Sequence, residues 1–263
     1  MTTQLLFYKN AVPVSPRRHG KHSVKAGKSY AFAAKVNSVP LTASEFADAA
    51  AEYPVVFAGE GDTVVPTAIL GVTDASNAFV DADGNWTGRY IPAFIRRYPF
   101  VFSTETADGQ LILHIDEDFE GLNTQDKGER LFDADGERTT YLKSVLAFLA
   151  DYQGRFNRSR QYCQRLVELD LLRPMQAQFT LPGGEQRSLT GFKTVDREKL
   201  KALPAEVIQQ MLTTDELECT FLHLASLRHF GAVAEKSAGA ASGRIDDGPA
   251  PDAATPATEE PVA

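Results

Sequence analysis

One long helical pattern, preceded by a series of short strand-like segments, indicates the fold class of this chain. The pattern runs from about residue 140 to residue 172, and its apolar side chains recur every three or four positions. Gly154 lies inside the pattern and is a candidate break in the helix. Four arginines lie along the same segment and can form a basic strip; they are Arg155, Arg158, Arg160 and Arg165.

Short apolar segments bounded by turn residues predict β-strands in the first half of the chain. These segments are residues 5–8, 31–39, 55–57, 64–72, 100–104 and 110–115. Beyond the long helix, residues 176–181 and 186–195 flank the turn signal Pro182-Gly-Gly184 and predict a hairpin. Strands and helices do not alternate regularly, so a Rossmann-type sheet is not expected. We predict an α+β fold with a mixed or antiparallel sheet and with helices concentrated in the C-terminal half.

Two capping-box signals mark the starts of further helices. Thr42 and Glu45 have the spacing of a capping box that opens a short helix. Thr213 and Glu216 have the same spacing, and they predict the start of a helix that ends near residue 231.

The chain is expected to form one globular domain followed by a tail. It has 263 residues and a hydrophobic content of 43%, which is enough for a full core. Residues 1–231 are assigned to the domain. Residues 232–263 are rich in Ala, Pro and acidic residues and contain almost no large apolar side chain. Such a segment does not offset its own ordering entropy, so we predict a disordered acidic tail.

The charge and hydropathy of the chain indicate where in the cell it is expected and which partners are not expected. No stretch approaches the roughly 20 apolar residues that a membrane span needs, and no secretory signal is visible at the N-terminus. Cys163 and Cys219 both fall in helical patterns and are expected to be free thiols, so we expect a cytoplasmic location. Secretion by a route without a signal stays open. Basic residues gather before Glu45, but the net charge of −8 argues against nucleic acid as a partner.

The segment of residues 86–102, called here the Arg/aromatic block, is the strongest candidate for a functional surface. It holds three arginines and six aromatic residues, and its two prolines predict a short helical turn between them. One interpretation is a core anchor. The other is a recognition surface in which Arg96 or Arg97 binds a carboxylate or phosphate beside an aromatic wall. The candidate ligand-binding residues are Trp86, Arg89, Tyr90, Phe94, Arg96, Arg97 and Tyr98.

A candidate metal site comes from His114 and Asp116. These residues are two apart in a predicted strand, so their side chains share one face. With a later histidine, His223 or His229, they have the ligand types of the two-His-one-carboxylate sites that bind Fe²⁺. The apolar helix around His223 is more typical of a core histidine whose hydrogen bonds are satisfied within the fold. No other cofactor is predicted, no catalytic residue is assigned, and whether the chain is an enzyme stays open.

Several motifs resemble one bacterial family. The run Gly88-Arg-Tyr-Ile-Pro-Ala-Phe-Ile-Arg-Arg-Tyr-Pro-Phe100, followed by Leu113-His-Ile-Asp-Glu117, resembles the central signature of the SapC family. Residues 189–200 and 221–229 support the resemblance, which covers about residues 5–231. The resemblance implies a single domain and an accessory role in surface-layer or outer-membrane nutrient-uptake systems. It implies no assigned chemistry.

Three hypotheses about function follow. The first, which we favour, is a non-catalytic accessory or binding protein whose Arg/aromatic block recognises a protein or a small anionic ligand. The second is a metal-dependent oxygenase or hydrolase that uses His114 and Asp116. The third is a structural protein associated with the surface layer. The sequence does not determine the ligand or the oligomeric state.

Overall fold

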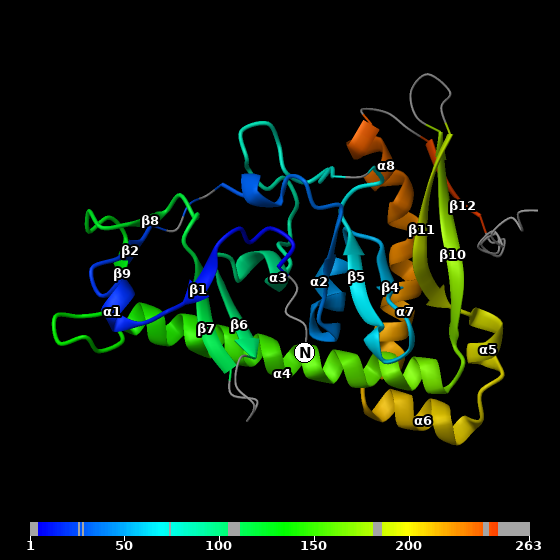
Figure 1. Cartoon of the computed structure of the whole chain (residues 1–263). Helices are drawn as coiled ribbons and strands as arrows, with labels where there is room; N and C mark the ends of the chain where they lie inside the picture. Colours follow the sequence, from blue (N-terminus) through cyan, green and yellow to red (C-terminus); the bar gives the residue numbers. More distant parts are fainter. Residues whose placement is uncertain are drawn as a thin grey trace, which may run out of the picture.

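A computed structural model describes residues 5–246 of the chain, except residues 26, 28, 74, 105–110, 181–185 and 239–241. The turn of the predicted hairpin at Pro182-Gly-Gly184 and the last part of the predicted tail, residues 247–263, lie outside the described residues. The order of elements and the antiparallel strand pairs confirm the α+β class, with most of the helical residues in the C-terminal half (Figure 1).

The largest sheet has six strands in the order β12-β10-β11-β4-β5-β3, and neighbouring strands in it are antiparallel. Its strands are β3 (Ser38–Pro40), β4 (Val55–Ala58), β5 (Val65–Ile69), β10 (Leu172–Thr180), β11 (Gln186–Val195) and β12 (Ser242–Asp246). The predicted hairpin is the pair β10–β11.

Two smaller antiparallel sheets lie at the other end of the molecule. One has the order β1-β7-β6 and the other has the order β8-β2-β9 (Figure 1). Their strands are β1 (Ala11–Pro13), β2 (Ser23–Val24), β6 (Phe100–Thr104), β7 (Leu111–Asp116), β8 (Leu122–Asn123) and β9 (Glu129–Arg130).

Helix α4 (Thr140–Glu168) joins the two ends of the molecule. Its 29 residues correspond to about 44 Å of helix. The N-terminal part packs through Leu142 and Leu149 against the β6–β7 sheet, and the C-terminal part packs through Tyr162 and Leu166 against the core of the large sheet. The helix continues through Gly154, so the candidate break is wrong. The packing of its N-terminal part on the β6–β7 sheet and of its C-terminal part on the core of the large sheet stabilises the helix across Gly154, which is a weak helix former.

The other helices are short and lie mostly after β11. They are α1 (Pro16–His19), α2 (Phe46–Ala49), α3 (Ala93–Arg96), α5 (Arg197–Lys201), α6 (Ala205–Thr213), α7 (Glu216–Ser226) and α8 (Phe230–Ala238), with short 3₁₀ turns η1 (Ala31–Ala33), η2 (Ala43–Glu45), η3 (Gly61–Thr63) and η4 (Leu227–His229).

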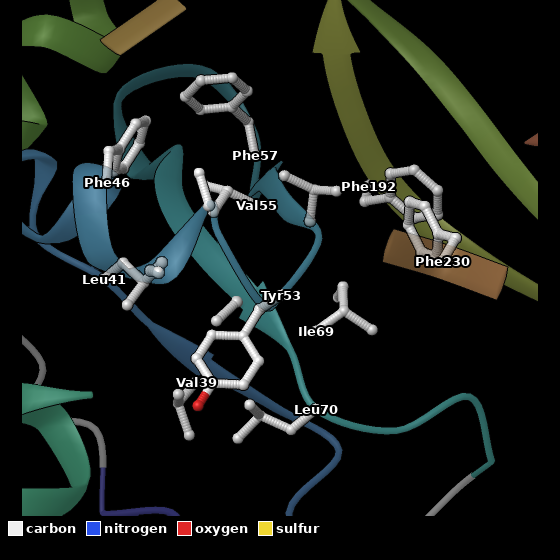
Figure 2. Packing of buried hydrophobic residues seen from close by; sticks show 14 of the residues in the cluster. Val39, Leu41, Phe46, Tyr53, Val55, Phe57, Ile69, Leu70, Phe192 and Phe230 are labelled. Carbon is white, nitrogen blue, oxygen red and sulfur yellow. The ribbon is translucent and has the colours of Figure 1, made fainter. Parts of the chain in front are cut away.

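The main core lies between the large sheet and helices α2, α4, α7 and α8. Figure 2 shows Phe46, Val55 and Phe57 on one side of it, and Phe192 beside Phe230 on the other. Phe46, Val55 and Phe57 are completely buried, and the rings of Phe192 and Phe230 stack with centroids 5.4 Å apart. Each buried side chain of this size stabilises the fold by roughly 1.5–3 kcal/mol.

Two of the predicted strands do not form as expected. Residues 5–8 form a turn, and residues 31–39 form the 3₁₀ turn η1 and only the start of β3. The buried ring of Phe7 packs edge-on against Phe32, Phe94 and Tyr98. Phe7 is therefore buried by aromatic packing rather than by strand pairing, whereas Leu5 and Leu6 stay exposed.

The second predicted capping box, at Thr213 and Glu216, does not form. Thr213 ends α6, a helix that the sequence analysis did not anticipate, and its hydroxyl donates back to the carbonyl of Gln209. Asp215, in the left-handed region with φ 61°, precedes α7 without a side-chain cap. Thr213 hydrogen-bonds within the last turn of its own helix and cannot cap the next one.

The folded part of the chain extends past residue 231. Helix α8 continues to Ala238 and buries Val233 and Ala234, and β12 pairs with β10. Placing the start of the tail at residue 232 is therefore wrong. Both side chains belong to the same core cluster as Phe230. No helix among the described residues has the length and apolar character to cross a membrane.

Candidate functional site

The Arg/aromatic block is held in place by two acidic side chains from outside it. Glu45, which is 5% exposed, accepts hydrogen bonds from the hydroxyl of Tyr90 (2.8 Å) and the backbone N–H of Ala93 (2.7 Å). Glu52 accepts from the backbone N–H groups of Arg89 (2.8 Å) and Tyr90 (3.2 Å). Helix α3 is thus capped by a carboxylate from η2, 48 residues earlier in the chain.

Trp86 braces the block from one side. Its indole Nε1–H donates to the carbonyl of Tyr90 (2.9 Å), and the hydroxyl of Tyr53 donates to the same oxygen. The indole ring stacks on Phe79 and meets Tyr30 edge-on, with centroids 6.0 and 5.8 Å away. These contacts give Trp86 a supporting position in the structure.

The two adjacent arginines at the C-terminal end of α3, Arg96 and Arg97, lie in different environments. Arg97 is buried, and its guanidinium carbon lies 3.9 Å from the ring centroid of Phe94 and 5.5 Å from that of Tyr152. Arg96 is exposed, and its Nε–H donates to the carbonyl of Ile91 (2.9 Å). Phe94 and Arg97 thus lie on the side of this helical turn that faces the core, whereas Arg96 lies on the side that faces outward.

A pocket of about 370 Å³ opens beside Arg96 and Arg97. Half-buried aromatic side chains from four separate parts of the chain line it. They are Tyr30, Phe32, Tyr98, Phe119, Tyr141 and Phe148. The pocket is within the usual size range of small-molecule sites, which are mostly apolar with a few polar groups.

Two tyrosine hydroxyls of this pocket, those of Tyr98 and Tyr141, are protonated near neutral pH. Burial, together with the nearby Asp116 carboxylate, raises the pKa of Tyr98. Burial, with a smaller contribution from Glu129, raises the pKa of Tyr141 to about 12. The hydroxyl of Tyr98 donates to Asp116 (3.2 Å), which fixes the ring against the pocket wall.

Asp116 anchors the N-terminal part of the chain. It is completely buried and accepts from the backbone N–H groups of Lys9 (3.0 Å), Asn10 (2.9 Å) and Asp118 (3.1 Å), in addition to Tyr98. Four donors occupy the lone pairs that a carboxylate offers. A metal ion at Asp116 would have to displace these hydrogen bonds.

The structure does not bring His223 to His114 and Asp116. His114 lies on β7 beside Ser103 and the carbonyl of Ile112. His223 is buried on α7, where its Nδ1 lies 2.6 Å from the carbonyl of Val55 and its Nε2 accepts from the N–H of Val195 (3.0 Å). These bonds assign the proton to Nδ1 and leave neither nitrogen for a metal.

The part of the chain that the structure describes contains no group of three or more His, Cys, Asp or Glu side chains that could hold a metal ion. The three-ligand arrangement is therefore wrong, and the residues do not fit an Fe²⁺ site. His223 matches the alternative interpretation, a core histidine whose hydrogen bonds are satisfied.

Only some of the predicted ligand-binding residues lie at the pocket. Arg96, Arg97 and Tyr98 line it, whereas Trp86, Arg89, Tyr90 and Phe94 support the block or lie elsewhere. The sequence analysis missed Phe32, Phe119, Tyr141 and Phe148 because they come from separate segments. Phe148 lies within the long helical pattern, but nothing in the sequence indicates that it approaches α3.

A model of the SapC family matches residues 14–233. The chain belongs to the SapC family. A search of curated proteins and a search of solved structures each find no match. The SapC match spans the whole Arg/aromatic block and the residues that line the pocket, from Val24 to Phe148.

Proposed function

We propose that this SapC-family chain is a non-catalytic binding protein whose pocket holds a small anion with an apolar body. The observation that carries the proposal is the pocket beside α3, where two arginines meet an aromatic wall. Arginine binds carboxylates and phosphates through directed hydrogen bonds, and aromatic rings bury the apolar part of a ligand.

Arg96 is the group that we assign to the anion. Its guanidinium carbon lies 5.6 Å from the ring centroid of Phe148 and 5.8 Å from that of Tyr90, so the charged group lies near two aromatic side chains. A guanidinium has five N–H donors. The carbonyl of Ile91 and the hydroxyl of Tyr90 use two of them, which leaves others for a ligand.

The absence of acid–base groups from the pocket supports binding without catalysis. Its described lining includes two arginines, three tyrosines and two serines as polar residues, and no Asp, Glu, His, Lys or Cys. Tyrosines with raised pKa values and arginines are poor proton carriers near neutral pH. We also propose that the chain acts in the cytoplasm as an accessory protein, since both cysteines are free thiols.

The test is calorimetric titration with phenylacetate and phenyl phosphate, each compared with the neutral analogue phenylacetamide. We expect at least one anion to bind at millimolar concentration or below and the neutral analogue to bind at least about tenfold more weakly. Arg96→Gln should remove the preference for the anion, because the side chain is exposed and its loss leaves the core intact.

Arg89→Gln is the matched control, because Arg89 is an exposed arginine of the same block that does not line the pocket. The proposal is wrong if no anion binds, or if Arg89→Gln and Arg96→Gln reduce the affinity equally.

A further inference from the structure

A second cavity, of about 630 Å³, lies on a different part of the molecule. Helix α4, the turn η2–α2 and the first two turns of α7 surround it. Small side chains, Ala43, Ser44 and Ala47, form one side and leave the space open. None of the residues that line it lines the pocket beside α3.

The walls that α4 and the start of α7 form in this cavity carry opposite charges. Arg155 and Arg158 line it from α4. Asp215, Glu216 and Glu218 line it from the start of α7. A cavity whose walls differ in sign suits a ligand that carries both charges, because each end then meets an opposite charge.

Within the described ranges of the chain, no ion pair joins the two arginines that line the cavity to the carboxylates of the opposite wall. Among the described residues, Arg158 and Glu218 take part in no ion pair. Arg155 pairs with Asp151 on its own helix (2.7 Å), and Glu216 pairs with Arg165 (3.3 Å). Arg155 also donates to the hydroxyl of Ser44 (3.3 Å), which holds its guanidinium at the cavity.

The buried polar groups behind the cavity are already satisfied and form a fixed floor. Ser159, 1% exposed, accepts from the N–H of Ala43 (2.7 Å) and donates to the carbonyl of Arg155 (2.8 Å). The hydroxyls of Tyr162 and Thr220 lie 2.9 Å apart. A ligand therefore meets a rigid base and two charged walls.

The cysteine of this cavity is not set up for covalent chemistry. Burial, with the nearby carboxylates of Glu218 and Asp215, raises the pKa of Cys219 to about 11. Its thiol donates to the carbonyl oxygen of Ala43, with Sγ 3.8 Å from that oxygen. A thiol in this state is a weak nucleophile, so the cavity is suited to binding.

We propose that this cavity is a second binding site, for a small amino carboxylate whose carboxylate binds Arg155 and Arg158 and whose ammonium group binds Glu216 and Glu218. The site is independent of the pocket beside α3, and the ligand differs from the one proposed there in carrying a cation as well as an anion.

The experiment is calorimetric titration of the full chain with glycine, γ-aminobutyrate and ε-aminohexanoate, which separate the two charges by increasing distances. Hexanoate and hexylamine each carry only one of the charges and are the matched compounds for the longest member. Because hexanoate is also an anion with an apolar body, these three titrations are made on Arg96→Gln, which lacks the anion group of the pocket beside α3. At least one amino carboxylate should bind at millimolar concentration or below. For ε-aminohexanoate we expect binding at least about tenfold tighter than for either single-charge compound.

Two variants locate the site. Arg158→Gln and Glu218→Gln should each reduce the affinity at least about tenfold without loss of fold, because both side chains are exposed and unpaired among the described residues. Arg160→Gln is the control, since Arg160 lies on the same helix and donates to the carbonyl of Asp62 outside the cavity. Failure of every amino carboxylate to bind, or equal binding of the single-charge compounds, overturns the proposal, as does an equal loss in Arg160→Gln. Arg96→Gln tests the other pocket and should leave this binding unchanged.

Discussion

Replacing Glu45 by Gln tests how the Arg/aromatic block is held. One oxygen of this carboxylate accepts from the N–H (2.8 Å) and the hydroxyl (2.9 Å) of Thr42, and the other accepts from Tyr90 and Ala93. Glutamine has a single carbonyl oxygen, so its NH₂ group must face either the N–H of Thr42 or the N–H of Ala93. In both orientations a buried backbone donor loses its acceptor.

Leaving one buried donor unsatisfied costs about 1–3 kcal/mol, and the lost charge on the remaining hydrogen bonds adds to this. We therefore expect Glu45→Gln to lower the free energy of unfolding by about 2–3 kcal/mol in urea denaturation at neutral pH. The variant should also weaken anion binding at the pocket, because α3 carries Arg96 and loses its cap.

Glu52→Gln is the matched control. Glu52 also accepts from backbone N–H groups of the block, but it is only half-buried and water can replace its bonds. The expected loss is below about 1 kcal/mol. Equal losses in the two variants, or no loss in Glu45→Gln, would refute the view that the buried carboxylate holds the block.

Three further predictions concern the fold. Burial lowers the pKa of His223 to about 4, so below about pH 6.5 the unfolded chain binds more protons than the folded protein. The free energy of unfolding should therefore be highest above that pH and fall by roughly 3 kcal/mol toward pH 4. Urea denaturation at several pH values measures this, and the fall should be smaller in His223→Gln. Gly154→Ala should stabilise the protein by about 0.5–1 kcal/mol in thermal denaturation, because the helix is continuous and a Cβ there meets no atom within 4 Å; a loss of stability would contradict this. Ending the chain after Gly231 should cost at least about 2 kcal/mol, since Val233 and Ala234 are buried, whereas ending it after Asp246 should change the unfolding midpoint little.

Local patterns predicted the elements that depend on near neighbours. The period of the apolar residues predicts α4, and the spacing of Thr42 and Glu45 predicts the capping box that the structure contains at η2. The short apolar segments and turn signals around β6, β7, β10 and β11 likewise predict these strands. Each of these signals acts over a few residues and follows from the geometry of the local backbone.

The same local reasoning failed where distant groups compete. Residues 5–8 have a strand-like composition, yet Phe7 is buried by three rings from two other segments. Thr213 and Glu216 have capping-box spacing, yet α6 ends on Thr213 and uses its hydroxyl. Gly154 is a poor helix former, but packing of α4 on two cores outweighs a cost of about 1 kcal/mol.

The sequence by itself determined the α+β class, the SapC resemblance and the short turn that carries Arg96 and Arg97, because these depend on residue type and local spacing. Only the tertiary structure decided which arginine faces the core. Arg97 points to Tyr8 and Tyr152, and Arg96 lies beside Phe148, all from distant segments. The pocket, the charged cavity and the separation of His223 from His114 have the same origin. They arise from side chains that are far apart along the chain, and the free energy that brings them together is that of the whole packed core.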